Sequence, residues 1–266
     1  MQGTKPREHE TTKARNYETT KLRKHESTNR KVGGQREGCP TLNDIRLLHL
    51  CDSLFPLGAF AYSDGLEAAT VRDRVATVEE LRGWLDVCLD ETIGRLEGPA
   101  VWRGWAAVGE ARWEALIALD EELTVLRPSS SARRSSRAMG LRLLTTWHAL
   151  HPDPRLVHAL ALARDGAIGP ALPIAFGGVC ACAAVDRVRA VESYAYTRLA
   201  ATVSSAMRLM PIGQSDAHVL LARTLERVPP LVSALAGLNP DPESFTPAMD
   251  IAAMTQQYLH SRLFRS

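Results

Sequence analysis

Two closely spaced residue pairs carry side chains that commonly bind transition metals. Cys180 and Cys182 are separated by one residue, and His148 and His151 by two. Thiolates and imidazoles are the usual ligands of such ions. On a helix, however, residues two apart point about 200° away from each other, so the cysteines can share an ion only with ligands from elsewhere. We therefore interpret the two cysteines as small core residues.

The histidine pair is limited in another way. His148 and His151 would share one helical face, but Pro152 ends that helix directly after them. No carboxylate on the helix completes a ligand set with them. Structural or exposed histidines are the favoured interpretation. A metal site built on His148, His151, His218 or the cysteines is kept as the alternative.

The sequence contains no nucleophile elbow, phosphate-binding glycine loop, zinc-protease helix or paired-carboxylate motif. The remaining concentration of reactive groups is the run from Arg127 to Arg137, which holds four arginines near an expected helix start. Such a run could bind phosphate or an acidic partner surface. A solvated loop and first helical turn is its more common origin, and we favour that interpretation.

Hydrophobic periodicity predicts two long amphipathic helices elsewhere in the chain. The first begins at Thr77, which forms a capping box with Glu80, and continues to Leu96. The second runs from near Ser193 to the break at Pro211. The apolar face of the first carries Val78, Leu81, Leu85, Cys88, Thr92 and Leu96. The apolar face of the second carries Tyr196, Leu199, Ala200, Val203, Met207 and Met210.

Proline and glycine pairs separate the helical stretches, as at Gly98–Pro99, and alternating strand-like patterns are nearly absent. Together with 45% hydrophobic residues, this predicts an all-α fold, a single-domain bundle of about eight to ten helices. Only Gly166–Val185 is long and uncharged enough to suggest a membrane span. Its glycines, prolines and alanines argue against insertion, so we expect a buried central helix starting near Pro170.

The first 38 residues form a separate segment. The sequence HETTKAR at 9–15 recurs as YETTKLR at 17–23 and HESTNRK at 25–31, with a period of eight residues. Few large apolar residues are present, so burial cannot offset the entropy of ordering. We predict a disordered basic tail over residues 1–38 and a folded domain over residues 39–266.

Charge and cysteine content limit the classes of partner. There are 32 Lys and Arg against 30 Asp and Glu, a formal net charge of +2, and the part after the basic tail is mildly acidic. We therefore expect no nucleic-acid or membrane partner, although tethering of the tail to an anionic surface is kept as a weaker hypothesis. Five scattered cysteines without a secretory segment favour the cytoplasm.

Two segments place apolar side chains where burial is difficult. Within Leu47–Glu67, an apolar half-helix meets Pro56, and a loop with Phe60 and Tyr62 follows before Ser63 caps a new helix. The chain ends in SRLFRS, with two apolar residues between arginines at a terminus that would otherwise fray. Both patterns indicate docking, either onto the body of the protein or onto a partner.

These two segments, with RLMPIGQSD at 208–216 and FTPAMDIAAM at 245–254, closely resemble the UreF family of urease accessory proteins. The likeness runs over about residues 42–266. Residues 55–67 are similar to the family pattern Leu-Pro-x-Gly-x-Phe-x-Tyr-Ser-x-Gly-Leu-Glu, and only Phe55 departs from it. The repeat tail has no counterpart in the family.

The resemblance implies an all-helical, dimerising, non-catalytic protein without a cofactor. It would bind UreD (also called UreH) and the GTPase UreG on apo-urease (UreABC), regulate GTP hydrolysis and support nickel incorporation. By that likeness, Arg262 helps to order the C-terminal tail as a partner-binding surface. The residues expected to bind partners are Phe60, Tyr62, Gln214, Asp216, Asp250, Arg262, Leu263, Phe264 and Arg265.

One difference from the family affects this expectation. Where the family commonly has a His-Glu pair, this chain has Gln256 and Gln257. Neutral amides would remove charge from the approach to the tail and so alter partner affinity.

The alternative function is a direct nickel carrier or a metal-dependent helical enzyme that uses the histidines or cysteines named above.

Overall fold

Side-chain N-caps begin several helices of the chain. From Thr41 onward the chain forms one compact unit. The computed structural model describes residue 1 and residues 41–265, apart from 59, 60 and 73. The repeat segment, Cys39 and Phe60 therefore lie outside the described residues.

The described chain is helical, and its one strand-like feature is an isolated bridge between two residues. Ten helices remain among the described residues if the continuous run from Val78 to Gly109 is counted once, η3 is counted with α13, which it follows directly, and the short α3 is set aside. The expected all-α bundle is confirmed. In chain order the elements are α2 (Leu42–Cys51), α3 (Leu66–Val71), α4 (Val78–Val87), η2 (Cys88–Glu97), α5 (Gly98–Gly109), α6 (Trp113–Leu126), α7 (Ser130–Leu150), α8 (Pro154–Arg164), α9 (Leu172–Cys182), α10 (Arg187–Leu209), α11 (Gln214–Leu225), α12 (Val228–Leu238), α13 (Pro247–Thr255) and η3 (Gln256–Tyr258).

The capping box at Thr77 is confirmed: its hydroxyl accepts the Glu80 amide, and the Glu80 carboxylate accepts the Thr77 amide at 2.9 Å. The expected break at Gly98–Pro99 was wrong, because the helix continues through it into α5. The π-helical segment η2 changes the hydrogen-bond register just before this point. Pro99 then stands in the first turn of α5, where a backbone N–H is not needed.

Helix α9 is the central helix, as expected for the uncharged stretch, and its residues from Leu172 to Ala181 are all buried. It packs backbone against backbone on α5. A Cβ atom added to Gly177 would lie 2.2 Å from the Val101 carbonyl oxygen, and one added to Gly104 would lie 2.8 Å from that of Ile174. Among the described residues, no helix combines the length and hydropathy that crossing a bilayer requires.

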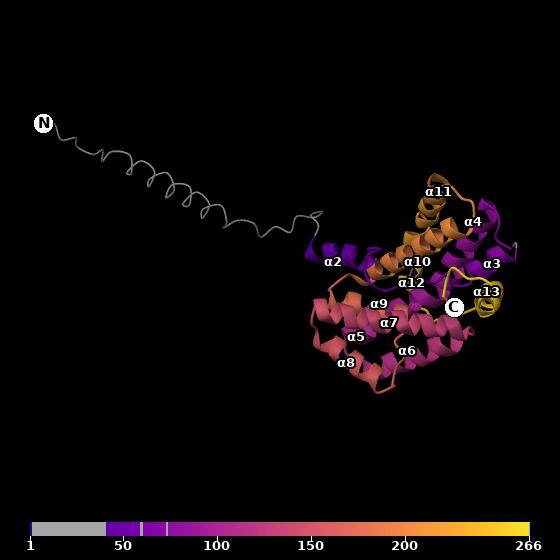
Figure 1. Cartoon of the computed structure of the whole chain (residues 1–266). Helices are drawn as coiled ribbons and strands as arrows, with labels where there is room; N and C mark the ends of the chain where they lie inside the picture. The colour runs from indigo at the N-terminus through magenta and orange to yellow at the C-terminus, as the bar shows by residue number, and fades with distance from the viewer. Residues whose placement is uncertain (2–40, 59–60, 73, 266) are drawn as a thin grey trace. The chain divides into compact units, whose positions relative to one another are not determined.

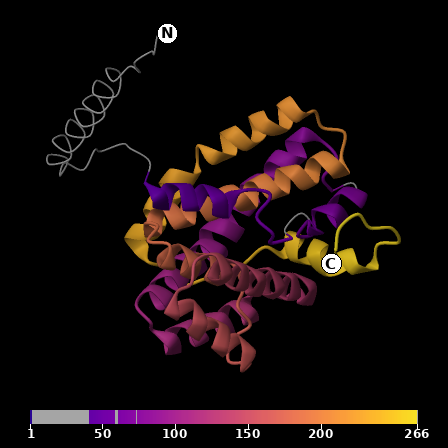
Figure 2. The same cartoon turned by 60° about the vertical axis from the view of Figure 1, so that its left-hand side comes forward.

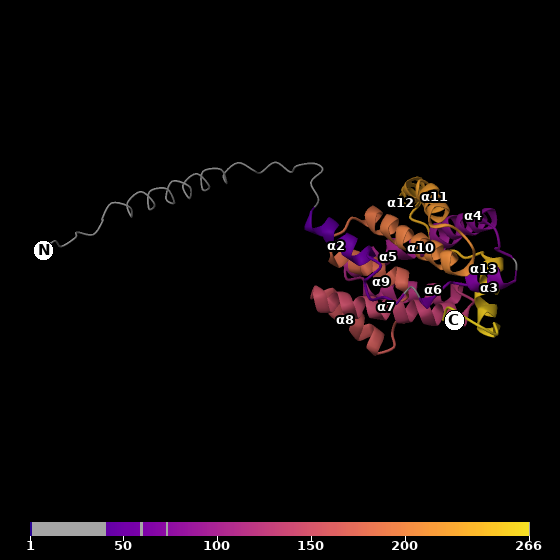
Figure 3. The ribbon, with the colours of Figure 1, turned by 45° about the horizontal axis from the view of Figure 1, so that its top comes forward.

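The other helices lie on two sides of this pair. Figures 1 and 3 show α7 and α8 on one side of α9, and α10, α11 and α12 on the other. Helix α10 begins before the expected Ser193, because the Asp186 side chain caps its first turn and accepts the Val188 amide at 2.9 Å. Tyr196, expected on the apolar face of α10, is 44% exposed.

The C-terminal part returns to the beginning of the folded region. Helix α13 packs against α3 and α7, and η3 follows it directly. The chain end lies beside α13 in the views of Figures 1 and 2. The two segments that stood out in the sequence, before α3 and after α13, are therefore neighbours.

Candidate functional site

The C-terminal tail is bound to the loop that precedes α3. Tyr62 and Arg265 form a parallel β-bridge. The backbone N–H of Arg265 donates to the Ala61 carbonyl oxygen at 2.7 Å. The loop before α3 and the tail thus form one structural unit. The tail is therefore docked onto the protein's own body.

Glu67, in the first turn of α3, holds the tail from the other side. Its carboxylate accepts the backbone N–H of Leu263 at 2.5 Å and that of Phe264 at 3.3 Å. The side-chain amide of Gln256 donates to it at 3.3 Å. Glu67 is only 3% exposed, and a buried carboxylate is stable only when such donors surround it. We call this arrangement the Glu67 clamp.

Gln256 connects the parts of the clamp. It is 2% exposed, and its carbonyl oxygen accepts the Ser63 hydroxyl at 3.1 Å and the Gly65 N–H at 3.0 Å. Its amide nitrogen also donates to the Arg265 carbonyl at 3.4 Å. Of the two neutral amides expected to alter charge near the tail, Gln256 lies inside and contacts the tail, and Gln257 is exposed.

Among tail residues 261–265, Phe264 is buried and the other four are exposed. Phe264 is 3% exposed, and the Arg208 guanidinium at the end of α10 lies 4.2 Å from its ring centroid, a cation–π contact. Arg262, Leu263 and Arg265 are exposed. Phe264 therefore anchors the tail to the body, while its neighbours face outward.

Exposed apolar side chains occur both on the segment formed by α13 and η3 and on the tail. Ile251, Met254 and Tyr258 follow one another at helical spacing and are exposed, as is Leu263 of the tail. Exposed apolar side chains flanked by arginine are typical of protein-binding sites. We call these four residues, with Arg262 beside them, the α13–tail surface.

A chain of opposite charges, buried at Glu97 and Arg198 and partly exposed at Asp64, supports the loop before α3. Arg198 of α10 pairs with Asp64 of the loop at 2.5 Å and with Glu97 at 2.9 Å, and Glu97 also pairs with Arg127. Glu97 is 1% exposed. Burial acts to raise the pKa of Asp64, but Arg198 and Arg127 outweigh it and hold that pKa below its ordinary value. The expectation of a solvated loop was wrong for Arg127, whose side chain is 14% exposed.

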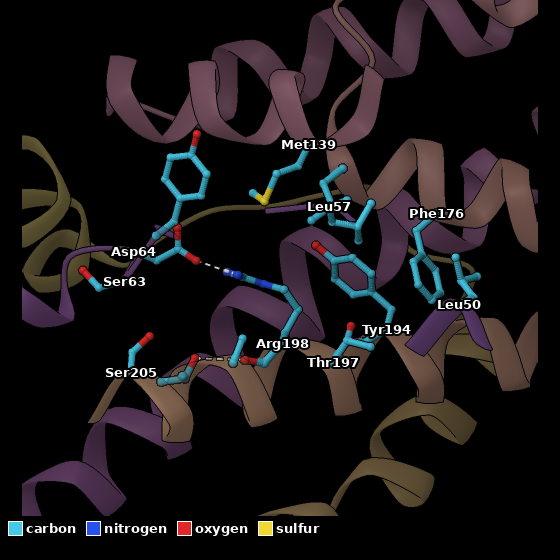
Figure 4. A pocket seen from close by; sticks show the side chains of 14 residues that line it. Leu50, Leu57, Ser63, Asp64, Met139, Phe176, Tyr194, Thr197, Arg198 and Ser205 are labelled. Atoms are coloured by element: carbon cyan, nitrogen blue, oxygen red, sulfur yellow. Dashed lines mark hydrogen bonds and ion pairs between the residues drawn. The ribbon is translucent and has the colours of Figure 1, made fainter. Parts of the chain in front are cut away.

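A small cavity adjoins this chain of charges (Figure 4). Its volume is about 60 Å³, and Asp64, Arg198, Tyr194 and Met139 are among its lining residues. The Tyr194 hydroxyl is buried and has no hydrogen-bond partner among the described residues. Ligand pockets usually measure about 300–1,000 Å³, so this cavity suits a few water molecules rather than a substrate.

The structure separates the other expected partner-binding residues. Asp250, on α13, is half-buried; burial raises its pKa, and the Thr246 hydroxyl donates to it at 3.2 Å. Gln214 and Asp216 are exposed in the first turn of α11, which packs against α4, α10 and α12. The structure brings the tail residues and Tyr62 together, whereas Gln214 and Asp216 belong to α11.

The metal-ligand candidates are dispersed. His148 accepts the Asp153 N–H at 3.5 Å, His151 packs 4.6 Å from the Trp147 ring, and His218 is exposed on α11. Cys180 is fully buried, and burial raises the pKa of the Cys88 thiol to about 12. Within the part of the chain that the structure describes, no three His, Cys, Asp or Glu side chains are grouped to hold a metal ion.

Sequence reasoning missed Glu67, Gln256 and Arg198 as site residues. The available signal was Glu67 itself, an acid placed directly between Leu66 and two alanines in the opening signature. The partners of Gln256 and Arg198 come from distant segments, so nothing near them in the sequence indicated their roles.

The described part of the chain is an all-helical protein whose C-terminal tail is docked on its own body. The family model of UreF matches residues 75–225, more than half of the chain. The chain belongs to the UreF family of urease accessory proteins.

Curated relatives agree over nearly their whole length. The urease accessory protein UreF of Azoarcus sp. (strain BH72) is 34% identical over 227 residues, which cover 84% of this chain and 95% of that protein. The UreF proteins of Nitrosococcus oceani and Methylobacillus flagellatus are 29% and 28% identical over 221 and 223 residues. These matches cover 83% and 84% of this chain and 97% of each relative.

Proposed function

We propose that this protein is a scaffold of urease maturation. It binds UreD (UreH) and the GTPase UreG on apo-urease, regulates GTP hydrolysis there and supports nickel incorporation, without a reaction centre of its own. It acts in the cytoplasm. Membership in the family of urease accessory proteins supports this proposal.

The observation that carries the proposal is the α13–tail surface held up by the Glu67 clamp. Tyr258 is 77% exposed, and the Leu263 side chain is 66% exposed although its backbone N–H donates to the buried Glu67. A rigid backbone with exposed apolar groups loses little conformational entropy on binding. Aromatic and arginine side chains at such a place are typical binding hot spots.

We further propose that two copies of the chain associate. Helix α2 buries Leu47 and Leu50 but exposes Leu42, Ile45 and Leu48, which recur every three residues along its other face. A second copy that contributes the same face would bury this stripe in a symmetric interface. A mass measurement in solution by light scattering, with Leu48→Asp as the variant, tests this proposal; the dimer should dissociate.

Co-elution on a sizing column tests the scaffold function. Full-length protein and a version ending at Gln257 are each mixed with UreD and UreG from the same genome. We expect the full chain to co-elute with its partners and the truncated version to lose at least one of them. Equal complex formation by both versions would contradict the role of the tail. No complex with either version, together with tight stoichiometric nickel binding, would favour the carrier alternative.

A further inference from the structure

A wide groove lies on the molecule away from the tail. Its floor is α5, and α6 lies along one border while α12 and the start of α10 form the other. It encloses a hollow of about 540 Å³, within the usual range for ligand sites. Small side chains leave it open, and five of them line it: Ala106, Ala107, Ala115, Ala118 and Ala236.

Three arginines surround this hollow. Arg187 is fixed in place, because its guanidinium lies 3.9 Å from the Trp102 ring centroid and its Nε donates to the Trp102 carbonyl at 2.8 Å. Burial lowers the pKa of Arg187, and the nearby charges of Arg112 and Arg103 lower it further against the opposing effect of Glu110. Among the described residues, Arg187 takes part in no ion pair. A pre-oriented guanidinium fork that makes no direct contact with a carboxylate is a ready anion receptor.

The other two arginines have partners that can be exchanged. Arg112 pairs at 3.1 Å with Glu110, and both side chains are more than half exposed. Arg103 pairs with Asp241, whose side chain is 72% exposed. Exposed ion pairs contribute little to stability, so an incoming carboxylate can replace either partner at small cost.

We propose that this groove, which we call the arginine groove, binds an acidic helical segment of a partner protein. Carboxylates of the segment would contact Arg187, Arg112 and Arg103, and its small apolar side chains would rest on the alanine floor. The small alanine side chains leave room in the groove, and an amphipathic helix laid in a groove is a common mode of peptide recognition. Glu122 also borders the groove, so a mixed segment fits better than a uniformly anionic chain such as polyphosphate.

The arginine groove is distinct from the α13–tail surface. Arg187 is the first residue of the 23-residue helix α10, and Arg208, which contacts the tail, is near its end. At a rise of about 1.5 Å per residue, the two arginines are about 30 Å apart. Binding in the arginine groove therefore does not depend on the role proposed for the tail.

Binding of a labelled peptide to the full-length protein tests this inference. The probe is a helical peptide of about fifteen residues, roughly four turns, with glutamates on one face and alanine and leucine on the other. Fluorescence anisotropy at low and moderate salt is compared for the wild type, Arg187→Ala, Arg187→Lys and Arg112→Ala. Arg164→Ala, which changes an exposed arginine of α8, is the matched control. A version of the peptide with lysine in place of glutamate and inorganic tripolyphosphate serve as competitors.

We expect saturable binding of the acidic peptide that weakens at least about tenfold in Arg187→Ala, less in Arg187→Lys, and not in Arg164→Ala. Arg112→Ala should also weaken binding, and because Arg112 is exposed this variant leaves the core intact if Arg187→Ala misfolds. Equal binding by the Arg112 and Arg187 variants and the wild type would overturn the proposal. So would equal binding of the lysine peptide, absence of saturable binding, or full displacement of the peptide by tripolyphosphate at lower concentration.

Discussion

Tyr62 and Arg265 lie opposite each other in a parallel β-bridge that joins the loop before α3 to the last residues of the chain. The bridge is one of several bonds that fix the tail, together with the carboxylate of Glu67 and the amide of Gln256. The tail of this protein is therefore an ordered part of the fold. Its exposed residues are presented on a rigid backbone.

Replacing Glu67 with alanine should release the tail. The substitution leaves two backbone N–H groups and the Gln256 amide without their buried acceptor, and each such loss costs about 1–3 kcal/mol. We expect trypsin to cleave after Arg262 at least about tenfold faster, because cleavage requires local opening. Glu67→Gln should give an intermediate rate, since one acceptor oxygen remains. A control is Glu79→Ala, at an exposed carboxylate on α4; a cleavage rate in Glu67→Ala equal to that of this control would contradict the clamp.

The neighbouring glutamines give a matched pair of variants. Gln256→Ala removes acceptors and donors used by Ser63, Gly65 and Arg265, whereas the exposed Gln257 donates its amide to the Met254 carbonyl. We expect Gln256→Ala to lower the free energy of unfolding by roughly 2–3 kcal/mol and Gln257→Ala by less than about 0.5 kcal/mol. Urea unfolding followed by circular dichroism measures both. Similar losses for the two variants would be inconsistent with an interior role for Gln256.

Arg198 should be far more important to stability than a surface arginine with equally many partners. Arg198→Ala leaves Glu97 with one cation and Asp64 with none in contact, and removal of one member of a buried pair costs roughly 3–5 kcal/mol. Arg227 also pairs with two carboxylates, Asp86 and Asp90, but these pairs are exposed, so Arg227→Ala should cost less than about 1 kcal/mol. Chemical denaturation of the two variants would show the difference. Equal losses would mean that the buried chain of charges contributes no more than surface pairs.

The Asp64–Arg198 pair should weaken in acid. Because the pKa of Asp64 is held below its ordinary value, the ionised form favours folding. That contribution is complete above the pKa of an unfolded aspartate, about 3.9, and is lost as the pH falls through the lower folded value. The stability difference between wild type and Asp64→Asn should therefore be constant from pH 7 to about 5 and shrink below about 4. Unfolding curves at several pH values test this; a difference that grows in acid would have the wrong sign.

Local signals in the sequence predicted much of the fold. The capping box of Thr77 and Glu80 fixed a helix start, and the uncharged stretch that contains α9 predicted a buried helix. The break expected at Gly98–Pro99 failed because the π-helical register of η2 depends on packing around it, which composition does not reveal.

Fewer of the contacts in the candidate site could be predicted from the sequence. The loop of Tyr62 and the terminal SRLFRS were both recognised as unusual, and they do meet. Arg127 stands in a serine- and arginine-rich run that is equally compatible with solvent exposure, and its partner Glu97 belongs to η2. Likewise, the buried state of Gln256 depends on Ser63 and Glu67 from the other end of the fold. Such pairings are set by tertiary structure, so local pattern could not supply them.

We propose that the exposed residues of the α13–tail surface bind partners, whereas the Glu67 clamp holds the backbone that carries them. The direct measurement is the affinity of immobilised UreD for the wild type, for the double variant Tyr258→Ala with Leu263→Ala, and for Val157→Ala. Val157 is 54% exposed on α8 and serves as the matched apolar control. We expect the double variant to bind UreD at least about tenfold more weakly with an unchanged melting temperature, and Val157→Ala to bind like the wild type. Unchanged affinity of a folded double variant would contradict the proposed binding role of Tyr258 and Leu263.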